Sequence, residues 1–213
     1  MRRGRPVLDK LGQTGILIVT MSLLLSLIAA QALTVPALTD DEKAKLEKYE
    51  AIIHPVKPTD GKGIGVQSFG IVDAPTSEVW PVLRDCEHFA KFMPRTKDSS
   101  VATVDGETIC HLEINMPFPL SNLWADSKQT LKEEEGGVYQ RAWSLKKGTY
   151  KRNNGSWTLH PWGPEKKQTL LVYSLDTDPA VLIPDGILRS AQVGSLPEVF
   201  KAVRARVTAL RTK

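Results

Sequence analysis

The chain has 213 residues, 41% of them hydrophobic, and a formal net charge of +4. Of its 28 Lys and Arg and 24 Asp and Glu, residues 1–32 contain four basic residues and one acidic, which leaves 24 and 23 for the rest. A nearly neutral remainder lacks the basic surface that binding to a phosphate backbone requires, so we expect no nucleic-acid partner.

Residues 1–32 have the pattern of a targeting segment. Three arginines within the first five residues precede an uncharged run, residues 11–32, which ends in the small-x-small sequence Ala30-Gln31-Ala32. The pattern predicts a cleaved signal peptide, and the run is also long enough to be an uncleaved membrane anchor. In either case we expect the folded part to be exported, either periplasmic or extracellular, and tethered to the membrane if the segment is retained.

Residues 33–63 are predicted to form a helix followed by a linker. Thr39 and Glu42 have the spacing of a capping box, which marks the start of a helix. One side of this helix is apolar, so it either docks on the domain or spaces the domain from the membrane; that side is formed by Leu46, Tyr49, Ile52 and Ile53. Residues 54–63 contain two prolines and two glycines among polar residues, which is typical of a linker.

From residue 65 the pattern changes to strands. Seven alternating or β-rich runs follow, over residues 65–72, 99–104, 107–116, 123–134, 137–146, 155–162 and 167–178. Turn sequences separate them, among them Asp105-Gly106, Gly136-Gly137 and Asn153-Asn154-Gly155. The short spacings favour antiparallel pairing, since parallel neighbours need a crossover of a dozen residues or more.

Three helices are predicted around these strands. Two short ones lie between the first and second runs, the first starting at Pro75 and the second carrying Phe89 and Phe92 on one face. A long one closes the chain, because apolar residues recur there at intervals of three and four, at Val193, Leu196, Phe200, Val203, Val207 and Leu210. Pro197 lies inside this stripe and predicts a kink or a restart. The order indicates an α+β fold in which one curled antiparallel sheet of about seven strands surrounds the long C-terminal helix.

Two segments resemble a known family. The sequence VDAPTSEVWPVLRDCEHFAKFMP, residues 72–94, resembles the opening signature of the START-like, or helix-grip, superfamily (SRPBCC). The sequence NNGSWTLHPW, residues 153–162, and the segment after it are similar to the closing hairpin and C-terminal helix of that superfamily. The resemblance covers residues 65 to about 210, and it implies that residues 64–213 are a START-like domain with the helix-grip fold.

The resemblance also implies a deep apolar cavity between the sheet and the long helix. The loop after the third strand and the N-terminal end of the helix would form its gate. The superfamily includes lipid-transfer proteins, polyketide cyclases, plant hormone receptors and coenzyme-Q-binding proteins, so the resemblance indicates a fold and does not by itself choose an activity.

Two cysteines, Cys86 and Cys110, allow two interpretations. In an exported chain they can form a disulfide, which would restrain the unfolded chain by roughly 3 kcal/mol. Alternatively, both are buried thiols. A Cα separation above ~7 Å would exclude the disulfide.

No motif indicates catalysis, a cofactor or a metal. The glycines of residues 61–65 lack the Lys-Ser/Thr sequence and the following helix of a phosphate loop, and the four histidines lack metal-ligand spacing. His111 and Glu113 lie among polar residues on neighbouring strands, which include Asp126, Lys128, Tyr139 and Arg141. Alternation places His111 and Glu113 opposite the apolar face of Cys110, Leu112, Ile114 and Met116, so we expect them to face solvent. The reversed register would favour acid–base chemistry in the cavity.

The sequence therefore favours a non-catalytic protein that binds, and by extension transports, a lipid or other apolar small molecule. The residues expected to line the cavity are Trp80, Leu112, Ile114, Met116, Trp143, Trp157, Leu159, Leu171, Tyr173, Ile187 and Phe200. Two alternatives stay open: a cyclase- or hydrolase-like enzyme that uses polar groups of the same cavity, and a structural protein whose side chains fill it. Residues 117–123 form either a simple strand connection or an apolar loop that contacts the membrane.

Overall fold

The computed structural model describes Met1, residues 33–184, 186–187, 190 and 193–212. The targeting segment predicted over residues 1–32 therefore lies outside the described residues, except for Met1. The chain divides at Ala32, and Leu33–Lys213 forms one compact unit, to which everything below refers. None of the helices in the described part of the chain is long and apolar enough to cross a membrane.

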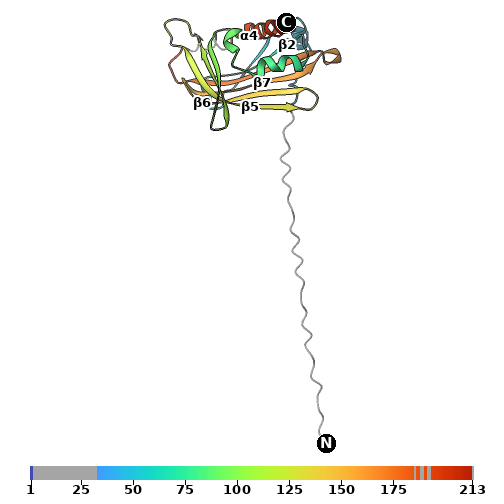
Figure 1. Cartoon of the computed structure of the whole chain (residues 1–213), viewed down its shortest axis with the longest axis horizontal. Helices are drawn as coiled ribbons and strands as arrows, with labels where there is room; N and C mark the ends of the chain where they lie inside the picture. Colours follow the sequence, from blue (N-terminus) through green and yellow to red (C-terminus); the bar gives the residue numbers. More distant parts are fainter. Residues whose placement is uncertain (2–32, 185, 188–189, 191–192, 213) are drawn as a thin grey trace. The chain divides into compact units, whose positions relative to one another are not determined.

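One antiparallel sheet carries the unit, as predicted (Figure 1). Its strands are β1 (Ile52–Val56), β2 (Ile64–Val72), β3 (Thr96–Val104), β4 (Glu107–Ile114), β5 (Leu123–Glu134), β6 (Val138–Gly148), β7 (Tyr150–Trp162) and β8 (Gln168–Pro179). Their order in the sheet is β1-β2-β8-β7-β6-β5-β4-β3. Strands that follow one another in the chain are therefore neighbours, except that β2 pairs with β8 instead of β3. The sheet has eight strands where the sequence predicted about seven.

The additional strand corrects the N-terminal prediction. Helix α1 (Asp40–Glu47) ends before Ile52, which the helical pattern had included, and Tyr49 turns the chain with a positive φ of 60°. Residues 54–56, predicted as linker, belong to β1, where Pro55 pairs with Val66 of β2. Proline lacks an N–H but is tolerated at a sheet edge, where β1 lies.

The start of α1 is confirmed, because Thr39 and Glu42 form both hydrogen bonds of a capping box. Leu46 of α1 is completely buried and packs on one face of the sheet, in a cluster with Ile52, Phe69, Ile71, Leu170 and Val172. The helix therefore docks on the sheet, which decides between the two roles considered for it.

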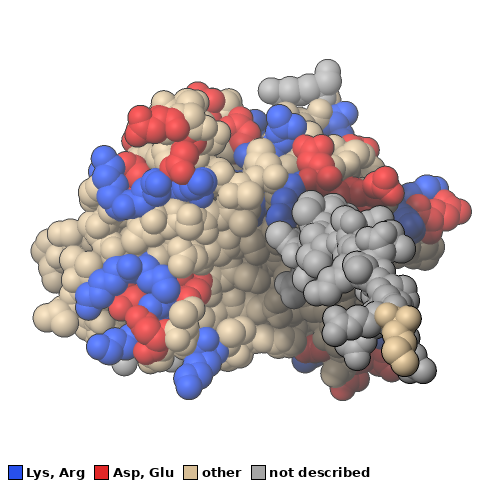
Figure 2. All heavy atoms as spheres, turned by 90° about the horizontal axis from the view of Figure 1, so that it is seen from below, with Lys and Arg blue, Asp and Glu red and all other residues tan. Residues whose placement is uncertain are grey.

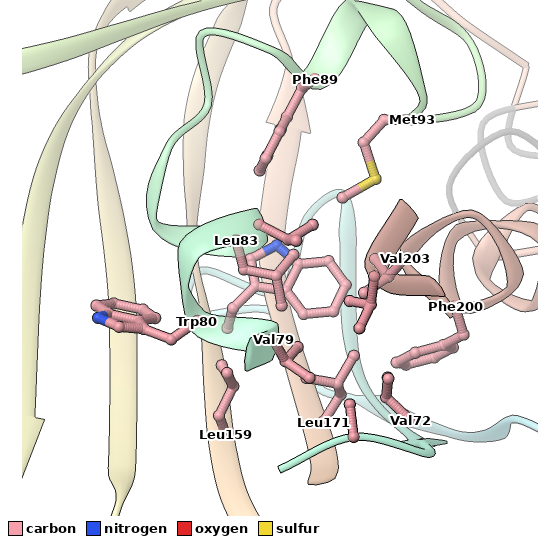
Figure 3. Close-up of a cluster of buried hydrophobic side chains, with 14 of the residues drawn as sticks. Val72, Val79, Trp80, Leu83, Phe89, Met93, Leu159, Leu171, Phe200 and Val203 are labelled. Carbon is pink, nitrogen blue, oxygen red and sulfur yellow. The ribbon is translucent and has the colours of Figure 1, made fainter. Parts of the chain in front are cut away.

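The main core lies on the opposite face. Helix α2 (Thr76–Arg84), the 3-10 turn η1 (Phe89–Lys91) and helix α4 (Leu196–Arg211) cover it. Residues of α2 and α4 pack there against Val72 and Leu171 of the sheet (Figure 3). Gly70 of β2 makes the approach of α4 close, since the ring of Phe200 occupies the space that a side chain at Gly70 would need.

Helix α4 follows its predicted stripe in part. Leu196, Phe200, Val203 and Val207 are buried, whereas Leu210, one residue before the end of the helix, is 43% exposed. Pro197 lies in the first turn, where its missing N–H costs no helical hydrogen bond. The restart expected at this proline therefore corresponds to the beginning of α4.

One predicted turn is wrong. Asn153-Asn154-Gly155 lies within β7, which begins at Tyr150 after a turn at Gly148 and Thr149. Gly155 is required in the strand because the indole of Trp143, on the neighbouring strand, lies over it and leaves no room for a Cβ. A glycine inside a strand often marks such a close approach instead of a turn.

Cys86 and Cys110 form a disulfide, with their Cα atoms 6.4 Å apart. Cys86 follows α2, and Cys110 lies on β4, near the far edge of the sheet from β2. The bond therefore joins the helical layer to the half of the sheet that α4 does not cover.

We predict that Gly70→Ala destabilises the protein by about 1–3 kcal/mol, the usual cost of forcing an extra methyl group into a packed core. The added Cβ would lie 2.6 Å from Cδ1 of Phe200. Urea unfolding followed by circular dichroism measures the change. Gly186→Ala is the matched control, because a Cβ there meets no atom within 4 Å; equal stabilities for the two variants would contradict the contact.

Candidate functional site

A cavity of about 180 Å³ lies on the concave side of the sheet and opens to the surface. Strands β4 to β8 form its floor, and η1 with the segment after it, Met116 and the first turn of α4 form the rest of its wall. The volume is close to that of an engineered apolar cavity that admits benzene, and below the ~300–1,000 Å³ of typical ligand pockets. A cavity is present, so side chains of the described residues do not fill this space.

The structure places six of the eleven predicted cavity residues on this wall: Leu112, Ile114, Met116, Trp143, Trp157 and Tyr173. Four others, Trp80, Leu159, Leu171 and Phe200, are at most 4% exposed and belong to the packed core beside the cavity (Figure 3). Ile187 is 37% exposed at the surface. Alternation identifies the inward face of a strand, but it does not tell which part of that face a helix covers. Whether the six residues contact a ligand stays a prediction.

The strands present these side chains through their register. Arg141 of β6 pairs with Trp157 of β7, which pairs with Tyr173 of β8, so the three lie in one row across the concave face. Trp143 lies two residues along β6 on the same face. The ring centroids of Trp157 and Tyr173 are 4.5 Å apart, and those of Trp143 and Tyr173 are 5.9 Å apart. The floor of the cavity is therefore a packed aromatic surface.

Polar groups interrupt this surface, and the prediction of cavity residues did not include them. Arg141, Gln129 and Tyr150 line the cavity, and Arg141 is only 2% exposed. Burial lowers the pKa of Arg141 to about 10 and raises the pKa of Tyr150 and of Tyr173 above their usual range. At neutral pH Arg141 is therefore cationic, and both phenols are neutral hydrogen-bonding groups. The alternation of Tyr139, Arg141 and Trp143 on one face of β6 was the sequence feature that could have identified Arg141.

The other polar residues singled out on these strands lie outside the cavity wall. Nδ1 of His111 lies 2.6 Å from Oδ1 of Asp126, and Nζ of Lys97 lies 2.9 Å from Oε1 of Glu113. His111 and Glu113 thus occupy the solvent-facing side, as alternation predicted. Glu107 accepts hydrogen bonds from Lys128 and Lys146, which lower its pKa to about 2. Figure 2 shows the same mixture on the face it presents, where Lys and Arg lie beside Asp and Glu.

The described residues contain one group that has the donors for a metal ion. Ligand atoms of Asp85, Glu87 and His88 lie within 4.8 Å of one another, and the two acidic residues are exposed. Asp85 already accepts the backbone N–H of Glu87 and lies 3.4 Å from Nδ1 of His88. This group lies outside the cavity wall, and among the described wall residues we find no carboxylate or imidazole.

The comparison with known protein families identifies one match. A family profile described as "Polyketide cyclase / dehydrase and lipid transport" matches residues 72–204, more than half of the chain. The matched region runs from the end of β2 to the middle of α4 and therefore contains the whole cavity wall. No curated protein matches the chain in sequence.

Solved structures with the same fold include lipid-transfer proteins and a cyclase. A STAR-related lipid transfer protein from Xanthomonas axonopodis is 23% identical, with a TM-score of 0.60 over 74% of this chain and 93% of that one. Human StAR-related lipid transfer protein 5 is 15% identical, with a TM-score of 0.63 over 76% and 83%. The Zhui aromatase/cyclase from a Streptomyces species is 18% identical, with a TM-score of 0.53 over 68% and 93%. At these identities the likeness shows the fold alone.

We predict that the cavity binds benzene and that benzene stabilises the protein. At a benzene concentration about five times its dissociation constant, the free energy of unfolding should rise by about 1 kcal/mol. Leu112→Trp should abolish the rise because the larger side chain fills the cavity from β4. Leu131→Trp is the control, since Leu131 is 47% exposed and outside the wall. Thermal unfolding with and without benzene measures the rise for the wild type and for each variant. If benzene stabilised Leu112→Trp as much as the wild-type protein, benzene would bind outside this cavity.

Proposed function

Because the chain belongs to the polyketide cyclase / dehydrase and lipid transport family, we propose that it binds a hydrophobic small molecule or lipid in this cavity and shields or carries it. The observation that carries the proposal is an unfilled cavity with a mainly apolar and aromatic wall, inside an otherwise packed fold. Each CH₂ group that enters such a space gains ~0.8 kcal/mol, before the cost of ordering the ligand.

The size of the cavity limits the ligand. About 180 Å³ admits a small ring or a short stretch of acyl chain and excludes a complete phospholipid. The cavity is open, so a longer ligand would insert one part and leave the rest at the mouth or against the membrane.

No described group favours the enzymatic alternative. General acid–base catalysis needs a positioned group whose pKa lies near the working pH. The titratable residues of the described wall are arginines and tyrosines, and for the buried members, Arg141, Tyr150 and Tyr173, the pKa lies far from neutrality.

We also propose that the protein acts outside the cytoplasm. The targeting pattern of residues 1–32 supports export. The disulfide between Cys86 and Cys110 supports it independently, since such bonds persist in oxidising compartments.

Two exposed apolar loops support a membrane contact near the mouth. Phe118, two residues beyond the wall residue Met116, is 96% exposed, and Leu182, in the segment after β8, is 100% exposed. Thr149 connects the start of β5, which follows the first loop, to the start of the second segment: its N–H donates to the carbonyl of Trp124, and its carbonyl accepts the N–H of Ala180. We propose that these loops touch the bilayer while the ligand enters or leaves.

Native mass spectrometry of the full chain, purified from its own membrane extract, tests the binding proposal. The expected result is a co-purifying hydrophobic adduct that organic solvent removes and that Leu112→Trp lacks. The protein mass in the same spectrum shows whether residues 1–32 have been cleaved. A protein free of any adduct, which also fails to bind fatty acids, alcohols and sterols in titrations, would contradict the proposal.

Liposome flotation tests the membrane contact. Phe118→Asp and Leu182→Asp should each reduce liposome association several-fold, because a carboxylate resists transfer out of water. Leu131→Asp introduces the same charge at an exposed leucine far along β5 from the loop and should have no effect. Unchanged association in both loop variants would exclude the contact.

A further inference from the structure

Arg141 is a buried cation on the wall of an apolar cavity. Its side chain comes from β6, pairs in register with Trp157 and is 2% exposed. Transfer of a guanidinium out of water is strongly unfavourable unless a counter-charge offsets it. The groups around Arg141 therefore indicate whether the protein itself supplies that counter-charge.

Among the residues that the structure describes, the guanidinium has only neutral direct contacts. Its Nε donates to Oε1 of Gln129 at 2.8 Å, and one terminal nitrogen donates to Sγ of Cys110 at 3.5 Å. The guanidinium also lies 4.9 Å from the ring centroid of Phe89 and 5.8 Å from that of Trp143. These contacts hold the group in place without neutralising it.

No acidic residue in the described part of the chain forms an ion pair with Arg141. The acid whose charge acts on it is Asp85. The carboxylate of Asp85 lies instead beside His88 and accepts the backbone N–H of Glu87. A guanidinium carries five N–H groups, and only two have acceptors among the described residues.

A second unused donor lies in the same row of the sheet. Tyr173 is one strand beyond Trp157, and its hydroxyl has no hydrogen-bond partner among the described residues. Burial keeps the phenol protonated, and the charge of Arg141 acts on it. A guanidinium and a phenol that line one cavity together suit a planar anion that accepts several hydrogen bonds.

We propose that the ligand is an amphiphile with an ionised carboxylate, whose head group binds Arg141 and Tyr173 while its apolar part lies against Trp143 and Leu112. This inference rests on the proposed function and names the class of ligand for the same cavity. A carboxylate matches the two-pronged geometry of a guanidinium, and it supplies the charge that the described protein groups do not. Its compact size also suits a cavity of about 180 Å³.

The test compares decanoate with 1-decanol, which share a chain length and differ in the head group. Titration of the full chain at neutral pH should show decanoate binding about tenfold to a hundredfold more tightly, as expected for hydrogen bonds to a charged group. Arg141→Met should remove this preference and leave 1-decanol binding in place. Arg206→Met is the control, since Arg206 lies over the ring of Phe92, outside the cavity wall.

Tyr173→Phe keeps the test decisive if Arg141→Met does not fold. This variant keeps the ring and should weaken decanoate several-fold while 1-decanol is unaffected. Equal affinity of the wild-type protein for the two compounds would overturn the carboxylate proposal and leave the proposed function standing. A preference for decanoate that survives Arg141→Met would also overturn it. Binding of neither compound would overturn the carboxylate proposal and count against the proposed function as well.

Discussion

The contact between Phe200 and Gly70 determines where helix α4 lies on the sheet. Because residue 70 has no side chain, the ring rests directly on the backbone of β2, and Val203 and Val207 follow it into the core. Helix α2 packs beside α4 over this part of the sheet. The cavity lies beside them, between the first turn of α4 and strands β4 to β8.

The disulfide and the aromatic row define the remaining walls. Cys110 lies on β4 at the cavity, and its bond to Cys86 attaches that side of the sheet to the segment after α2. Trp157 packs against Phe200 at 6.0 Å and against Tyr173 at 4.5 Å between ring centroids. Trp157 thus contacts both α4 and the floor of the cavity, so a change in the packing of α4 should shift side chains that line the cavity.

Charges are distributed differently on the two faces of the same strands. On the outer face, acidic residues such as Glu107 and Glu113 are paired with lysines in contact with water. On the inner face, Arg141 has only neutral neighbours among the described residues. Surface pairs of this kind contribute little to stability, whereas a buried cation carries a desolvation cost that a bound anion would relieve. Because of this difference, the inner face is the one that can distinguish an anionic ligand from a neutral one.

The sequence by itself determined those features of the fold that depend on the periodicity of neighbouring residues. Short-range sequence patterns predicted the capping box of α1 and the antiparallel pairing. A repeat of two residues predicted the inward face of β4, and intervals of three and four residues predicted the apolar stripe of α4. These patterns identified the fold, and the motif of residues 72–94 placed the chain near its superfamily. Six cavity residues, including Leu112 and Tyr173, were predicted because strand alternation alone selects their side.

Only the tertiary structure decided how far each inward side chain lies from a covering helix. Leu159 and Leu171 alternate as Leu112 does, yet α2 and α4 bury them in the core. The same holds for Gly155, which resembled a turn residue until the ring of Trp143 was seen to occupy its space. Arg141 appeared as one polar residue among several, because a sequence contains no measure of burial or of the distance to the nearest acid. Depth and charge pairing are properties of contacts between residues far apart in the chain, so they appear only once the chain has folded.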